Sequence, residues 1–98
     1  MRVMISAGGT VTAQSVVKAL REDGRASFVA IVDLDDLNAT KAFVDAFVRV
    51  PRADDPDFVT ACLDAVRRLR IGLFIPIIVE REFLPIGAAR EAFERLGC

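Results

Sequence analysis

Histidine, tyrosine and tryptophan are absent from this sequence of 98 residues, and lysine occurs only at positions 18 and 41. Without histidine the chain lacks the commonest general base, the commonest metal ligand and any Ser-His or Cys-His nucleophile pair. A self-contained enzyme would have to work with carboxylates, arginines, two lysines and backbone groups. This inventory disfavours catalysis by the chain alone and predicts no metal site.

Cysteine is scarce as well. Cys62 and Cys98 lie far apart in the sequence, without the spacing of a metal site. Cys62 falls on the apolar side of an expected helix, so we interpret it as a small buried thiol. Cys98, the last residue, is expected to fray.

The chain also has no excess of either charge and no long hydrophobic run. The net charge is −1 and neither sign forms a long run, which predicts no binding to nucleic acid or to an anionic membrane. The uncharged apolar stretch from Ile71 to Val79 is far too short to span a bilayer. No signal peptide pattern is visible at the N-terminus, so a cytoplasmic location is expected.

Apolar side chains, in contrast, are abundant. They make up 53% of the chain, the mean hydropathy is +0.39, and the length predicts a single domain over residues 1–98. This composition predicts either helices that cover both faces of a sheet or apolar surface that a partner covers.

Short apolar runs alternate with helical patterns along the chain. The runs predict strands at Arg2–Ile5, Phe28–Val32, Phe47–Val50 and Leu73–Ile75. Helices are predicted from Thr10 to Gly24, from a cap at Asn38 to about Val44, from Asp55-Pro56 to Leu69, and over Ala89–Gly97. Continuously apolar strands in this alternation predict an α/β class, with a small Rossmann-like parallel four-stranded sheet of order 3-2-1-4 and helices on both faces.

The turn after the first strand, S-A-G-G-T at 6–10, lies where ligands bind in open parallel sheets. Its small residues and the free N–H groups of the next helix would suit an anion, which makes Ser6, Gly8, Gly9 and Thr10 candidates. The turn matches neither the dinucleotide fingerprint nor the P-loop. The alternative is that the glycines only form a tight turn and that Thr10 caps the helix.

Acidic residues follow the second and fourth strands at the same expected edge. Asp33 occupies the place where dinucleotide-binding folds keep a carboxylate for a ribose hydroxyl, but without the glycine pattern a solvated turn explains it better. Asp35 is a further binding candidate, although a solvated turn explains Asp35 and Asp36 better. The charged segment Glu80-Arg81-Glu82 is expected in a solvated loop, or else in contact with substrate or a neighbouring domain, and Glu80 and Glu82 are its binding candidates.

The order of several motifs resembles the N-terminal domain of ATP-grasp ligases, in particular the pre-ATP-grasp domain of the carbamoyl-phosphate-synthase-like group. They span the chain: S-A-G-G-T at 6–10, V-D-L-D at 32–35, V-P at 50–51, A-D-D-P-D-F-V at 53–59, F-I-P at 74–76 and L-P-I-G-A-A-R-E-A-F-E-R-L-G at 84–97. By position, Gly8 and Gly9 match the family's glycine turn, Asp33 its acidic residue after strand two and Glu82 that after strand four. The chain departs from the family at Ile77 and Val79, where members commonly carry Thr and Asp.

The resemblance implies a domain that forms part of the substrate pocket wall and of an inter-domain or dimer contact. ATP and magnesium would be held by other domains of the ligase, in the same or a companion chain, and the domain alone would be inactive. A stand-alone interaction or dimerisation module is the second hypothesis. A dinucleotide-binding domain is the third.

Overall fold

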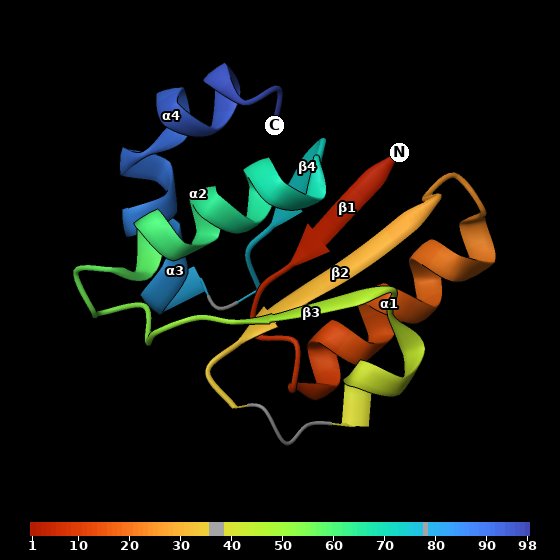
Figure 1. The fold of residues 1–98 in the computed structure, drawn as a ribbon. Coiled ribbons are helices and arrows are strands. Elements are labelled where there is room, and N and C mark those ends of the chain that lie inside the picture. The colour runs from red at the N-terminus through yellow and green to blue at the C-terminus, as the bar shows by residue number, and fades with distance from the viewer. Residues whose placement is uncertain (36–38, 78) are drawn as a thin grey trace.

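The structure, a computed structural model, is built on one parallel sheet. It describes residues 1–35, 39–77 and 79–98, with the backbone alone at 79 and 80. The strands are β1 (Arg2–Ile5), β2 (Phe28–Asp33), β3 (Ala46–Arg49) and β4 (Leu73–Ile75). They are hydrogen-bonded in the order β3-β2-β1-β4 and all run parallel, as Figure 1 shows. The predicted fold class and strand order are therefore confirmed.

Successive side chains of the central strands point to opposite faces of the sheet and divide the core into two clusters. On one face, Val3 and Ile5 of β1 pack with the helix α1 (Val11–Asp23), and the 3-10 helix η1 (Ala39–Phe43) lies beside it. On the other face, Met4 packs with α2 (Phe58–Leu69) and with α4 (Arg90–Arg95). Because both faces are covered, β1 and β2 can be apolar at almost every position.

The ends of α1 follow their sequence signals. The Thr10 hydroxyl accepts a hydrogen bond from the Ala13 N–H at 3.1 Å, and Gly24 ends the helix in the left-handed region at φ 82°. The predicted bounds are thus confirmed.

Other boundaries differ from prediction by one to three residues. β2 continues to Asp33, and β3 covers Ala46–Arg49 instead of 47–50. The prediction that α2 begins at Asp55-Pro56 is wrong: the carboxylate of Asp55 accepts from the Asp57 N–H at 2.8 Å, which forms a turn, and the helix begins at Phe58. The expected cap Asn38, like Asp36, lies outside the described residues.

The segment after β4 is the largest correction. Residues 80–82 belong to a helix, α3 (Val79–Ala88), and not to a loop, and a separate short helix α4 follows in place of one helix over 89–97. Pro85 and Gly87 lie inside α3, and both are weak helix formers, so sequence pattern alone favours a loop here. Among the described residues, no helix is both long and apolar enough to cross a membrane.

We predict that Gly8→Ala lowers the free energy of unfolding by about 1–3 kcal/mol, because a Cβ at position 8 would lie 2.6 Å from the Ile31 Cβ. Urea denaturation measures this effect. Gly87→Ala is the matched control: its Cβ meets no atom within 4 Å, and the better helix former should leave stability unchanged or raise it by up to about 1 kcal/mol. Equal effects of both substitutions would contradict the close approach.

Candidate functional site

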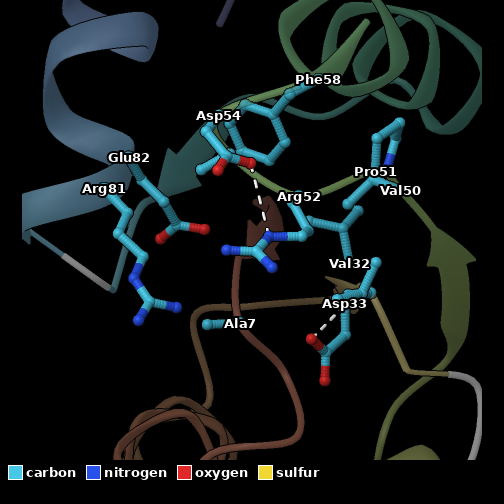
Figure 2. A pocket seen from close by; sticks show the side chains of 12 residues that line it. Ala7, Val32, Asp33, Val50, Pro51, Arg52, Asp54, Phe58, Arg81 and Glu82 are labelled. Carbon is cyan, nitrogen blue, oxygen red and sulfur yellow. Dashed lines mark hydrogen bonds and ion pairs between the residues drawn. The ribbon is translucent and has the colours of Figure 1, made fainter. Parts of the chain in front are cut away.

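A cleft of about 580 Å³ opens at the carboxyl edge of the sheet (Figure 2). The first turn, the ends of β2 and β3, and the beginnings of α2 and α3 enclose it. Its lining residues are Ala7, Val32, Asp33, Leu34, Val50, Pro51, Arg52, Ala53, Asp54, Phe58, Arg81 and Glu82. Parallel sheets bind ligands at this edge, so the cleft is the candidate functional site.

A buried hydrogen-bond cluster ties the first turn to α3. The Ser6 hydroxyl donates to Oε1 of Glu82 at 2.5 Å, and the Ile77 N–H lies 2.8 Å from the Ser6 Oγ and 3.1 Å from the same Glu82 oxygen. Ser6 is fully buried and Glu82 is only 5% exposed. Glu82 therefore anchors α3 at the cleft, and the expectation that it lies in a solvated loop is wrong.

A second contact joins the first turn to the end of β2. The Gly9 N–H donates to Oδ2 of Asp33 at 2.8 Å, and Oδ1 of Asp33 accepts from the Leu34 N–H at 2.7 Å. Both carboxylate oxygens of Asp33 thus bind backbone N–H groups. A ribose hydroxyl would have to share these oxygens with the backbone.

The first turn closes tightly on the sheet. Gly8 donates its N–H to the Val32 carbonyl at 3.0 Å, and Thr10 donates its N–H to the Ala7 carbonyl at 3.0 Å. Ala7 itself takes a positive φ of 48°. With Gly9 bound to Asp33, the N–H groups of residues 8, 9 and 10 all have protein acceptors, so an anion would have to displace one of these bonds. The geometry favours the turn-only interpretation.

Two arginines also line the cleft: Arg52, which sequence reasoning did not select, and Arg81, which it considered only as part of the charged segment 80–82 and not as a binding residue. Arg52 follows the Pro51 that ends the third strand region, and its side chain points into the cleft, 3.4 Å from the carboxylate of Asp54 (Figure 2). Arg81 reaches the cleft from the first turn of α3. Their one sequence signal is that each comes shortly after the proline that ends a predicted strand.

The structure brings most of the candidate residues together. Asp33 and Glu82 line the cleft, whereas Ser6, Gly8, Gly9 and Thr10 belong to the adjacent turn, from which Ala7 reaches the cleft wall. Asp35 is exposed and does not line the cleft. The backbone of Glu80 lies in α3, and its side chain is outside the described part of the chain. Ile77 packs against the core cluster on the α1 face, which accounts for an apolar residue after the fourth strand.

Cys62 is not a nucleophile at this site. It lies in the core against the sheet, and burial raises the pKa of its thiol to about 12, with a further contribution from the negative charge of Glu82. Burial also raises the pKa of Cys98. Across the described residues, no group of three or more histidine, cysteine, aspartate or glutamate side chains is placed to hold a metal ion.

Comparison with protein families decides the relationship. The family model described as PylC-like, N-terminal domain matches residues 3–98. The chain belongs to this family. A PylC-like N-terminal domain is a pre-ATP-grasp domain of ATP-grasp ligases, which agrees with the resemblance found in the sequence. A comparison with curated proteins found no match.

Membership in the PylC-like N-terminal family indicates the kind of protein to which the cleft belongs. The PylC-like N-terminal domain is one part of an ATP-grasp-type ligase, and the cleft opens at the edge where a Rossmann-like sheet binds ligands. The described side chains at this edge can bind and orient a ligand through guanidinium groups, carboxylates and apolar contacts.

We expect Ser6→Ala to lower the free energy of unfolding by about 1–3 kcal/mol, because the buried Glu82 carboxylate loses a donor. Chemical denaturation measures the change. Ser15→Ala removes a hydroxyl that lies exposed on α1 and should change stability by less than about 0.5 kcal/mol. In a double-mutant cycle, Ser6→Ala and Glu82→Gln should be non-additive. Additive losses would contradict a direct contact.

The thiol of Cys62 should resist modification in the folded protein. With a pKa of about 12, roughly one thiol in 10⁴ is ionised at pH 8, and the core shields it. In a Cys98→Ser variant we expect a thiol reagent to react on the order of 100-fold more slowly than in Cys62→Ser, and to react fully once urea unfolds the chain. Rapid labelling of folded Cys98→Ser would show that α2 opens readily.

Proposed function

We propose that this chain is the N-terminal domain of an ATP-dependent carboxylate–amine ligase of the carbamoyl-phosphate-synthase-like ATP-grasp group, and that the cleft at the carboxyl edge of its sheet forms one wall of the substrate pocket. The observation that carries the proposal is a cleft of about 580 Å³ at the carboxyl edge of the sheet, in a chain of the PylC-like N-terminal family. That volume is within the usual range for small-molecule sites.

In such a ligase a carboxylate receives a phosphoryl group from ATP, and a nitrogen nucleophile then displaces phosphate from the acyl phosphate. ATP and magnesium belong to the remaining domains in this proposal. The contribution of this chain is to bind and orient substrate, because its cleft presents arginines, carboxylates and apolar groups but no histidine.

The same proposal gives the domain a partner in the remaining ATP-grasp domains, of the same or a companion chain, within the cytoplasm. Two large apolar side chains of α3 support a contact surface, since Phe83 is 53% and Leu84 is 80% exposed. A homodimer through this surface is the second candidate, which corresponds to an interaction module. Sedimentation at high concentration distinguishes them: a monomer favours the first and a dimer the second.

Reconstitution tests the ligase function. The chain is combined with the ATP-grasp body encoded in the same gene or beside it, and ADP formation is measured with candidate carboxylate and amine substrates. We expect substrate-dependent ADP formation only when both parts are present. A body that forms ADP equally well without this chain would contradict the proposal.

Millimolar MgATP should shift the melting temperature of the isolated chain by less than about 1 °C. A ligand at ten times its dissociation constant adds about 1.4 kcal/mol to the stability of the folded state, which is about 6 °C or more for a domain of this size. Thermal denaturation followed by circular dichroism measures the shift. A rise of several degrees with ATP or NAD would show that the chain has a nucleotide site of its own.

A further inference from the structure

We propose that the cleft at the carboxyl edge of the sheet is a carboxylate-binding subsite, in which Arg81 binds the carboxylate of the ligand and the apolar wall around Pro51 and Ala53 takes its carbon chain. The inference rests on the proposed function, in that the ligand is a substrate or product of the ligase. It adds which part of the ligand this cleft binds and the residue that recognises it.

Arg81 is the charged residue of the cleft that is best placed to bind a ligand. Among the described residues its guanidinium makes no hydrogen bond and no ion pair, although it projects toward the cleft (Figure 2). A guanidinium offers five N–H donors in a plane and matches a carboxylate with two parallel hydrogen bonds. An arginine that faces a cleft without a protein partner therefore favours an anionic ligand.

The acidic residues Asp33 and Glu82 of the cleft are compatible with an anionic ligand beside Arg81, because backbone and hydroxyl donors already bind them. Asp33 accepts hydrogen bonds from two backbone N–H groups, and Glu82 accepts from the Ser6 hydroxyl and the Ile77 N–H. These donors partly offset the negative charge of each carboxylate and keep it in place. Both acids thus serve to hold the walls of the cleft together.

Arg52 adds a second positive group on the opposite wall. Its pair with Asp54 is long, at 3.4 Å, and the two side chains are 64% and 75% exposed, so the pair is weak. Its guanidinium points into the cleft and retains donors for a ligand beside Asp54 (Figure 2). Arg52 therefore supports an anion held by Arg81 without being required for it.

The apolar part of the wall decides between a carboxylate with a carbon chain and a small inorganic anion. Leu34, Pro51 and Ala53 line the cleft with apolar side chains that are at least partly exposed, whereas Val32, Val50 and Phe58 behind them are buried. A phosphate ion would leave this surface and most of the 580 Å³ unused, whereas a short aliphatic acid contacts both parts.

Nuclear magnetic resonance titration of the ¹⁵N-labelled chain tests the subsite with three probes. Sodium hexanoate should shift the amide signals of Arg52, Ala53 and Glu82 in a saturable way, with a dissociation constant of about 1–10 mM for so small a ligand. Hexylammonium, which has the same number of carbon atoms and the opposite charge, should leave these signals in place. Phosphate should bind at least about tenfold more weakly, and equal binding of phosphate would overturn the carboxylate assignment.

Variants identify the residue. Arg81→Gln should weaken hexanoate binding at least about fivefold, and Arg81→Lys, which keeps the charge but loses the planar fork, should be intermediate. The matched control is Arg70→Gln, since Arg70 is exposed just before β4, at the opposite edge of the sheet. The amide spectrum of each variant reports its folding directly. Unchanged affinity in folded Arg81→Gln, or an equal loss in Arg70→Gln, would overturn the proposal.

Failure of the subsite and failure of the proposed function give different results. If hexanoate does not bind and the chain is still required for ADP formation in reconstitution, the subsite is wrong and the ligase function stands. If hexanoate binds through Arg81 and the ligase body does not need the chain, the subsite stands and the ligase function is wrong.

Discussion

The cleft depends on one buried hydrogen bond, between the Ser6 hydroxyl and the Glu82 carboxylate, whose residues are 76 positions apart in the chain. The bond joins the end of β1 to the first turns of α3, and the Ile77 N–H lies against the same two oxygen atoms. A buried carboxylate is stable in a core only when donors surround it. The requirement to satisfy Glu82 therefore fixes where α3 begins, and with it the position of Arg81 beside the cleft.

The parallel sheet places the rest of the site. Because all four strands run the same way, the turn that follows each carboxyl end lies at one edge, where α1, α2 and α3 begin. The contact of Gly9 with Asp33 locks two of these connections together. The close approach of Gly8 to Ile31 holds the first turn against the sheet, and the neighbouring Ala7 lines the cleft. Membership in the PylC-like N-terminal family then connects this open edge with an ATP-grasp-type ligase.

Much of this architecture could be predicted from local sequence signals. Apolar runs predicted all four strands and their order, and the Thr10 cap and Gly24 predicted both ends of α1. Asp33 and Glu82 were expected at the same edge, and their contacts with Gly9 and Ser6 confirm it. The helix α3 was missed because Pro85 and Gly87 weaken its pattern, while tertiary contacts through Glu82 and Ile86 compensate. Arg52 was missed, and Arg81 was not distinguished from the acidic residues beside it, because an arginine in a polar stretch carries no local signal of what it faces.

The sequence by itself determined the class of the fold, the strand order and the family, since these depend on hydrophobic periodicity, turn residues and motif order along the chain. Only the tertiary structure decided which polar groups form hydrogen bonds or ion pairs within the protein and which can bind a ligand. Whether Asp33, Glu82 or Arg81 has a protein partner depends on side chains that lie tens of residues away and meet only when the sheet forms. Hydrogen bonding is short-ranged and directional, so the three-dimensional arrangement alone assigns those partners.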